Sequence, residues 1–408
     1  LRWAVPGVAV ALVAAGFAAR PLLASADSTD LPPLTADQLV AKVAGTAPQP
    51  LSGTVVYTAN LGLPDVSTLA ETMGHGMTKA DPVNLLSGSS TLRVWTDAAQ
   101  RSRVSLLGTT SEYSVVHDGT QAWSYSSSDQ SVVHYALSPQ DAARLAQEQA
   151  TGTAGGTVPV PTDLPTPTQA ADDLLTQVEQ FSTVSLDAAT TVAGRAAYQL
   201  VVTPTSHTTL VSRVVIAVDA TTWSPLRVQL WSTQDTAKPA LELGFTDVTF
   251  ATPSDTVLSF STPAGATVKE VTVPLPTSDQ LDQQRKAGAD AASAVSTSGT
   301  GWDTVVTVTG VPTDALTSGA LTPGALASAA AVPTDAATSL TDQLGSSSAA
   351  GGANPQALLQ GLTTAVDGGR LLSSSLLSVL VLDDGRVLAG AVPAATLTAA
   401  AAAAPVAG

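Results

Sequence analysis

The sequence predicts an α+β protein with a large antiparallel sheet, few helices and a smaller C-terminal α/β module. Three observations support this fold class. Between Leu51 and Phe260, short β-branched runs alternate with turn residues. Only a few short segments of the chain show helical spacing, and a second group of strand-like runs follows residue 300. A large sheet with so little helix must close on itself or cover something apolar.

The first 26 residues read as a targeting segment. Arg2 precedes an uncharged run, Trp3–Ala19, and Ala24-Ser25-Ala26 matches a signal-peptidase site. The alternative is an N-terminal anchor made by residues 3–19. In both cases we expect the rest of the chain to lie outside the cytoplasm, secreted or in the cell envelope.

A domain is predicted over residues 35–276. Thr35 and Gln38 form a capping box for a short helix that ends near Gly45. Residues 61–88 and 151–168 are rich in Gly, Pro, Met, Thr or Ala and predict mobile loops. Two helices are expected on either side of the second loop, from Ser138 to about Gln149 and from Gln169 to about Phe181.

The strands of this domain follow from β-branched and alternating patterns. The predicted strands are Leu51–Ala59, Thr91–Thr96, Arg101–Leu107, Glu112–His117, Gln121–Tyr125, Val132–Leu137, Val184–Val192, Ala196–Thr203, Leu210–Asp219, Leu226–Thr233, Leu241–Phe250 and Val257–Phe260.

A smaller module is predicted over residues 300–392. Its core is a hairpin, Leu376–Leu382 and Arg386–Val392, joined by an Asp-Gly turn. Residues 310–354 form a low-complexity insertion, and we expect a disordered Ala-rich tail over 393–408.

Composition excludes several classes of function. The formal charge is −16, with only 17 Lys and Arg and no clusters of them, which argues against nucleic acid as a partner. The absence of cysteine excludes disulfides and thiolate metal sites. We expect a monomer in which burial of apolar groups supplies the stability.

The sequence shows little catalytic chemistry, and we predict no enzyme and no cofactor. It lacks His-Glu-x-x-His, Gly-x-Ser-x-Gly and phosphate-loop motifs. His117 and His134 could join a serine in a triad, although they also fit as surface histidines near turns. Met73, His75 and Met77 form a weak candidate for soft Cu(I), and a flexible loop whose methionines dip into an apolar pocket is the alternative.

Several segments resemble the LolA, LppX and RseB (MucB) superfamily of lipoprotein carriers and sigma-E regulatory proteins. The resemblance covers about residues 35–270 and depends on the order of its segments more than on any one of them. The matching segments are Leu51–Tyr57 after a short helix, Asp118–Tyr125, Val192–Val202, Val215–Asp219, Ser224–Val228, Phe245–Phe250 and Leu258–Phe260.

This resemblance implies a half-open β-barrel, covered by helices, that encloses an apolar cavity. We therefore expect an extracytoplasmic carrier of a lipid or lipoprotein acyl chain. The alternative is an RseB-like sensor that contacts a membrane-bound anti-sigma factor through residues 300–392. The residues predicted to line the ligand site are Val55, Tyr57, Leu92, Val94, Trp123, Tyr198, Leu200, Val202, Val228 and Leu230. These positions depend on register, because a shift of one residue exchanges the two faces of a strand.

Overall fold

The structure, a computed structural model, describes residues 31–63, 78, 80–150, 179–273, 295–310 and 361–403. The predicted signal segment, the residues Met73, His75 and Met77, and the linker 151–168 lie outside these ranges, as does nearly all of the insertion 310–354. Within the described ranges, no helix is long and apolar enough to cross a membrane.

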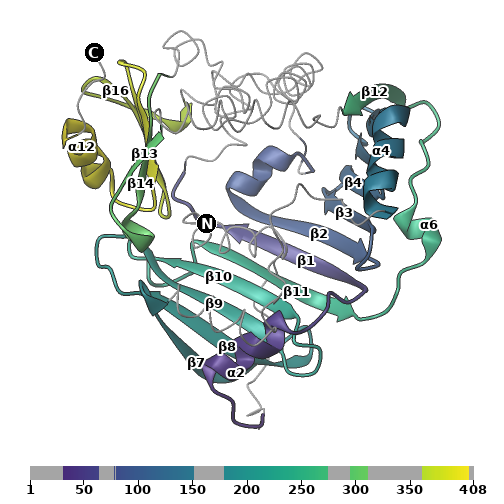
Figure 1. The fold of residues 1–408 in the computed structure, drawn as a ribbon, viewed down its shortest axis with the longest axis horizontal. Helices are drawn as coiled ribbons and strands as arrows, with labels where there is room; N and C mark the ends of the chain where they lie inside the picture. Colours follow the sequence, from purple (N-terminus) through teal and green to yellow (C-terminus); the bar gives the residue numbers. More distant parts are fainter. Residues whose placement is uncertain are drawn as a thin grey trace.

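A twelve-stranded sheet dominates the fold, as predicted (Figure 1). It is open, with β12 at one edge and β7 at the other, and its strand order is β12-β6-β5-β4-β3-β2-β1-β11-β10-β9-β8-β7. The strands are β1 (Leu51–Ala59), β2 (Gly88–Thr96), β3 (Arg101–Leu107), β4 (Glu112–Asp118), β5 (Gln121–Ser126), β6 (Ser131–Leu137), β7 (Ser182–Val192), β8 (Arg195–Pro204), β9 (Val211–Asp219), β10 (Pro225–Ser232), β11 (Leu241–Thr249) and β12 (Thr267–Val273).

The pairing is antiparallel throughout this sheet except at one edge. There β12 runs parallel to β6, so the sheet is mixed rather than purely antiparallel as predicted. Register shifts interrupt the pairing in four places: β1 with β11, β7 with β8, and β10 with β9 at two points. Bulges of this kind bend strands and increase their twist, which suits a sheet that curves without closing.

Among the described residues, helices cover only parts of the sheet. They are α2 (Ala36–Ala44), the 3₁₀ turn η1 (Pro82–Leu86), α4 (Pro139–Ala150) and α6 (Asp255–Leu258). The predicted capping box of α2 is confirmed, because Gln38 N–H donates to the Thr35 hydroxyl at 3.2 Å and Thr35 N–H donates to the Gln38 amide oxygen at 3.0 Å.

The predicted strand Val257–Phe260 is wrong, because Asp255–Leu258 is helical. Leu258 is fully buried as one turn of α6 lies across β2, β3 and β4. Arg101 Nη1 donates to Asp255 Oδ1 at 2.7 Å and ties this turn to β3. Ser254 and Asp255 favour a helix start here, and the segment has no neighbouring strand to pair with.

The C-terminal module is a six-stranded sheet of order β13-β14-β18-β17-β16-β15. Its elements are β13 (Val295–Ser298), η2 (Gly301–Asp303), β14 (Val305–Val308), β15 (Thr364–Val366), β16 (Gly369–Ser373), β17 (Ser378–Leu382), β18 (Val387–Gly390) and α12 (Ala394–Ala403). The predicted Asp-Gly hairpin joins β17 to β18, and Gly385 adopts the positive φ of 83° that such a turn requires.

The predicted disordered tail differs from what is observed. Residues 394–403 form α12, whose Leu397 is fully buried against Leu380 and Leu388. Arg386 Nη1 donates to the Ala401 carbonyl oxygen at 2.8 Å and holds the end of this helix. Alanine is the strongest helix former, so the Ala-rich composition favours a helix here. Packing of this helix through a hydrophobic contact then stabilises it.

Candidate functional site

The two faces of the large sheet differ in charge. Cross-strand partners share a face, and successive residues alternate, so the register assigns every strand residue. We call the face of Val55 and Tyr57 the apolar face, and the opposite one the charged face. Within β1–β11, all of which the structure describes, every Asp, Glu, Lys and Arg lies on the charged face. These residues are Arg93, Arg101, Arg103, Glu112, Asp118, Asp187, Arg195, Arg213, Asp219, Arg227, Glu242 and Asp247.

Nine of the ten predicted lining residues lie on the apolar face. One row across the sheet shows how the register places them, since Tyr57 pairs with Leu243, Leu243 with Val228, Val228 with Ile216, and Ile216 with Leu200. The nine residues are Val55, Tyr57, Leu92, Val94, Tyr198, Leu200, Val202, Val228 and Leu230.

Trp123 is the exception and lies on the charged face. It pairs with Val116, which pairs with Arg103. Its indole stacks on His134 at a centroid distance of 4.8 Å and on Phe260 at 5.7 Å. These stacked rings fasten the segment after α6 to the edge of the sheet, so Trp123 belongs to a separate group from the other nine.

Three elements cover parts of the apolar face. Helix α2 lies over the β7 and β8 end, as Figure 1 shows, and its fully buried Leu39 packs with Tyr198 and Leu200. The Tyr198 hydroxyl donates to the Pro32 carbonyl at 2.8 Å, and Lys42 Nζ lies 4.4 Å above the Trp223 ring. This end of the face is therefore packed as core.

The other two covers are η1 and the C-terminal module. Leu85 of η1 packs against the cluster that holds Val55 and Leu92. Leu376 and Trp302 of the module belong to the cluster that holds Val228. Tyr57, Val202 and Leu230 pack against this same cluster.

A row of valines on the apolar face is left partly open. Val94 pairs with Val104, Val104 with Val115, Val115 with Ser124, and Ser124 with Val133. Val115 in the middle is 43% exposed, and the other valines are half-buried. The row crosses five strands, from β2 to β6, and spans about 19 Å at the usual strand spacing.

Tyrosine and serine hydroxyls lie beside this row, and His117 is the one imidazole on the same face of β2–β6. Tyr113, Ser124 and Tyr135 lie on the same face by register. Burial raises the pKa of Tyr113, and it also raises that of Tyr57, so both phenols stay protonated at physiological pH. No Asp, Glu, Lys or Arg of the described strands β2–β6 lies on this face, so an apolar chain can be buried there without burying an unpaired carboxylate, ammonium or guanidinium group.

The charged face carries a buried ion pair at the β8–β9 end. The Asp219 side chain is 1% exposed and accepts from Arg195 Nε and, at 3.0 Å, from Arg195 Nη2. Burial by itself raises the pKa of Asp219, but the Arg195 guanidinium and the N–H groups of Thr222 and Thr221 outweigh it and hold the pKa below its usual range. This pair fastens the turn after β9 and belongs to the framework of the sheet.

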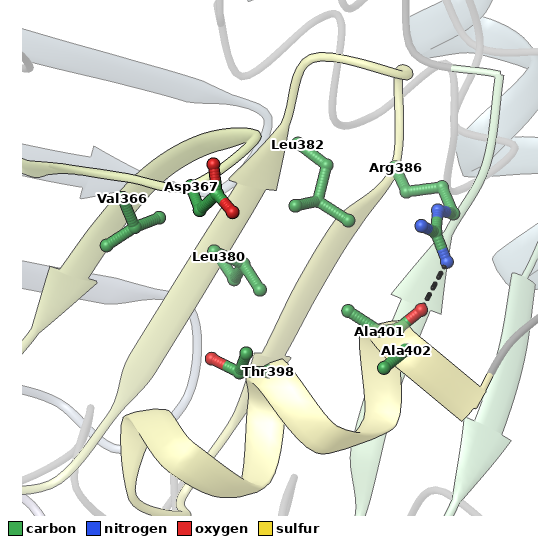
Figure 2. A pocket seen from close by; sticks show the side chains of 8 residues that line it. All are labelled: Val366, Asp367, Leu380, Leu382, Arg386, Thr398, Ala401 and Ala402. Atoms are coloured by element: carbon green, nitrogen blue, oxygen red, sulfur yellow. Dashed lines mark hydrogen bonds between the residues drawn. The ribbon is translucent and has the colours of Figure 1, made fainter.

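Figure 2 shows a pocket in the C-terminal module. It has a volume of about 230 Å³ and lies between α12 and the strands around Leu380 and Leu382. The guanidinium of Arg386 at its edge is already bound to Asp384 and to the Ala401 carbonyl. The pocket is too small for an acyl chain of ordinary length, since ligand pockets usually enclose 300–1,000 Å³.

The two histidines of the alternative catalytic triad lie on opposite faces of the sheet. His117 lies exposed on the apolar face, while His134 lies on the charged face, bonded to Glu270 at 2.7 Å and to Gln121 at 2.9 Å. The two histidines therefore do not converge. Among the described residues no group of three or more His, Asp or Glu side chains could hold a metal ion.

Comparison with solved structures finds similar ones of several kinds, including MucB and LolA-superfamily proteins. The chain is similar to MucB in the complex structure of Pseudomonas aeruginosa MucA/MucB, at 17% identity and a TM-score of 0.39 over 89% of this chain and 96% of that one. It is also similar to MucB in complex with MucA(peri), at 15% identity and a TM-score of 0.40 over 91% and 95% of the two chains. The LolA superfamily protein NE2245 from Nitrosomonas europaea is similar at 12% identity and a TM-score of 0.19, over 56% of this chain and 99% of that one.

These are the RseB/MucB and LolA kinds of protein that the sequence resembles. Each of these TM-scores is below 0.5. No protein-family model matches the chain, and no curated protein matches it in sequence.

Proposed function

We propose that this protein is an extracytoplasmic binding protein that holds the acyl chain of a lipid or lipoprotein on the apolar face of its large sheet. The observation that carries the proposal is the separation of charge between the two faces. Such a separation is ordinary where a face is fully covered, but here Val115 lies exposed in the middle of the valine row on the apolar face.

The energetics of an acyl chain suit this surface. Each buried CH₂ contributes about 0.8 kcal/mol, so a chain that lies along the valine row gains useful affinity without any charged contact. The half-buried Val94, Val104 and Val133 supply the sides of such a site. The hydroxyls of Tyr113 and Tyr135 supply neutral hydrogen-bonding groups beside it.

Native mass spectrometry of the full chain, purified gently from a host with an intact envelope, tests the proposal. We expect a fraction of the protein to carry an added mass that organic extraction removes and that fragments as a lipid. Repeated spectra of the empty chain, together with no uptake of added fatty acid, would contradict it.

The sequence also predicts a second role, an RseB-like sensor that contacts a membrane-bound anti-sigma factor. The observation that favours it is that the C-terminal module touches the same apolar face through Leu376 and Trp302. A sensor needs such a contact if occupancy of the site is to change what the module presents. Co-purification of the full chain with membrane proteins is its test, and recovery of no membrane partner in either the loaded or the empty form would count against it.

A further inference from the structure

The C-terminal module places a leucine on the apolar face. The turn between β16 and β17, Ser374–Leu377, is one of the parts of the module that contact the large sheet. Leu376 in this turn is 9% exposed and packs in one cluster with Val214, Val228 and Leu243. The next residue, Leu377, is 42% exposed.

Hydrogen bonds fix this turn against the ends of two strands. Ser375 N–H donates to the Leu61 carbonyl at 2.8 Å, and the Ser375 hydroxyl donates to the Asn60 carbonyl at 3.1 Å. The Ser232 hydroxyl donates to the Ser375 carbonyl at 2.6 Å. All the groups of Ser375 that can hydrogen-bond are therefore used to hold Leu376 in place.

The module makes further polar contacts with the large sheet. Leu210 N–H and the Thr209 hydroxyl donate to the Ala391 carbonyl at 2.7 and 2.8 Å. Trp302 Nε1 donates to the Ser182 hydroxyl at 2.8 Å. Water can replace hydrogen bonds of this kind at little net cost, so a competitor for the place of Leu376 could release the contact.

We propose that Leu376 is an internal competitor for the ligand, so that a bound acyl chain and the docked C-terminal module exclude each other on the apolar face over the central strands β1, β11 and β10. This inference rests on the proposed function and concerns the regulation of ligand binding. Tyr57, Val202 and Leu230 pack against the cluster that Leu376 occupies, and all three are predicted lining residues. An acyl chain that extends from the valine row onto these residues must take the place of Leu376.

Hydrogen exchange in the wild-type protein tests the competition directly. The amides of Ser375 and Leu210 donate across the contact, while the Ala220 amide donates to the Ala196 carbonyl at 3.0 Å, at the opposite end of β9, and serves as the reference. Saturation with cis-parinaric acid, a fluorescent fatty acid, should speed exchange at Ser375 and Leu210 by about tenfold or more and leave Ala220 unchanged. Binding of the probe with no change at either contact amide would overturn the proposal and leave the proposed function standing.

A pair of neighbouring leucines gives a second, independent measurement. We expect Leu376→Ala to tighten cis-parinaric acid binding by about tenfold, the factor that 1.4 kcal/mol gives, because a smaller side chain competes less well. Leu377→Ala should bind as the wild type does, since this side chain is exposed. Equal affinities in both variants and the wild type would overturn the competition. Failure of the wild type and both variants to bind any probe would instead remove the proposed function, and this inference with it.

Discussion

A carboxylate placed at position 115 should abolish ligand binding while leaving the fold intact. In the empty protein Val115 is 43% exposed, so an aspartate there stays hydrated and costs no more than about 1 kcal/mol in strand preference. A bound acyl chain would remove that water. Burying an unpaired carboxylate costs several kcal/mol, and about 3 kcal/mol already corresponds to a loss of roughly 100-fold in affinity. Titration of the Val115→Asp variant with cis-parinaric acid measures this loss.

Val268 provides a closely matched control. It is also a strand valine and is 42% exposed, but its partner Val132 lies on the charged face. We expect Val268→Asp to change affinity by no more than about twofold, the range of ordinary surface substitutions. Both variants should unfold at nearly the temperature of the wild type. Equal loss of binding in the two variants, or full binding by Val115→Asp, would refute the assignment of the site to the apolar face.

Two further predictions concern the framework of the sheet. Asp219→Asn should lower the free energy of unfolding by about 1.5–3 kcal/mol, because it removes the charged acceptor of the Arg195 guanidinium, which is itself 31% exposed and stays partly hydrated. The pKa of Asp219 is lowered in the folded protein. Its contribution to the free energy of unfolding is therefore present above the unfolded pKa near 4 and is lost as the pH falls through the pKa of the folded state. Urea titrations at decreasing pH should accordingly show a smaller acid destabilisation in the variant than in the wild type. Leu39→Ala should cost about 2–5 kcal/mol because the side chain is fully buried under α2, and Val40→Ala, at a half-buried position, should cost clearly less in the same titrations.

Local patterns predicted most of the large sheet. β-branched runs with turn residues between them gave the strands, and alternation within each strand gave the face of nine lining residues. The predicted face of Trp123 is wrong. In β5 the small residues Ala122, Ser124 and Ser126 lie on the apolar face, and the larger residues that alternate with them lie on the charged face. Stacking on His134 and Phe260 buries the indole there, and neither contact is visible in the sequence around it.

Contacts between distant segments could not be predicted. Leu376 lies in a short Ser- and Leu-rich stretch that reads only as part of a hairpin, yet it packs on residues more than 130 positions earlier, such as Val228 and Leu243. The parallel pairing of β12 with β6 likewise joins segments 136 positions apart, as in the His134–Glu270 contact. Helix α12 is different, since its run of alanine is a helix signal that the sequence does contain.

The face that holds the ligand is the central claim, and photocrosslinking with a diazirine-labelled fatty acid tests it most directly. The full chain would be irradiated with the bound probe, digested, and mapped by mass spectrometry. We predict adducts at Val94, Val104, Val115 and Val133, with residues of the charged face on the same strands, such as Arg103 and Trp123, left unlabelled. Adducts concentrated on the charged face, or spread equally over both faces, would contradict the claim.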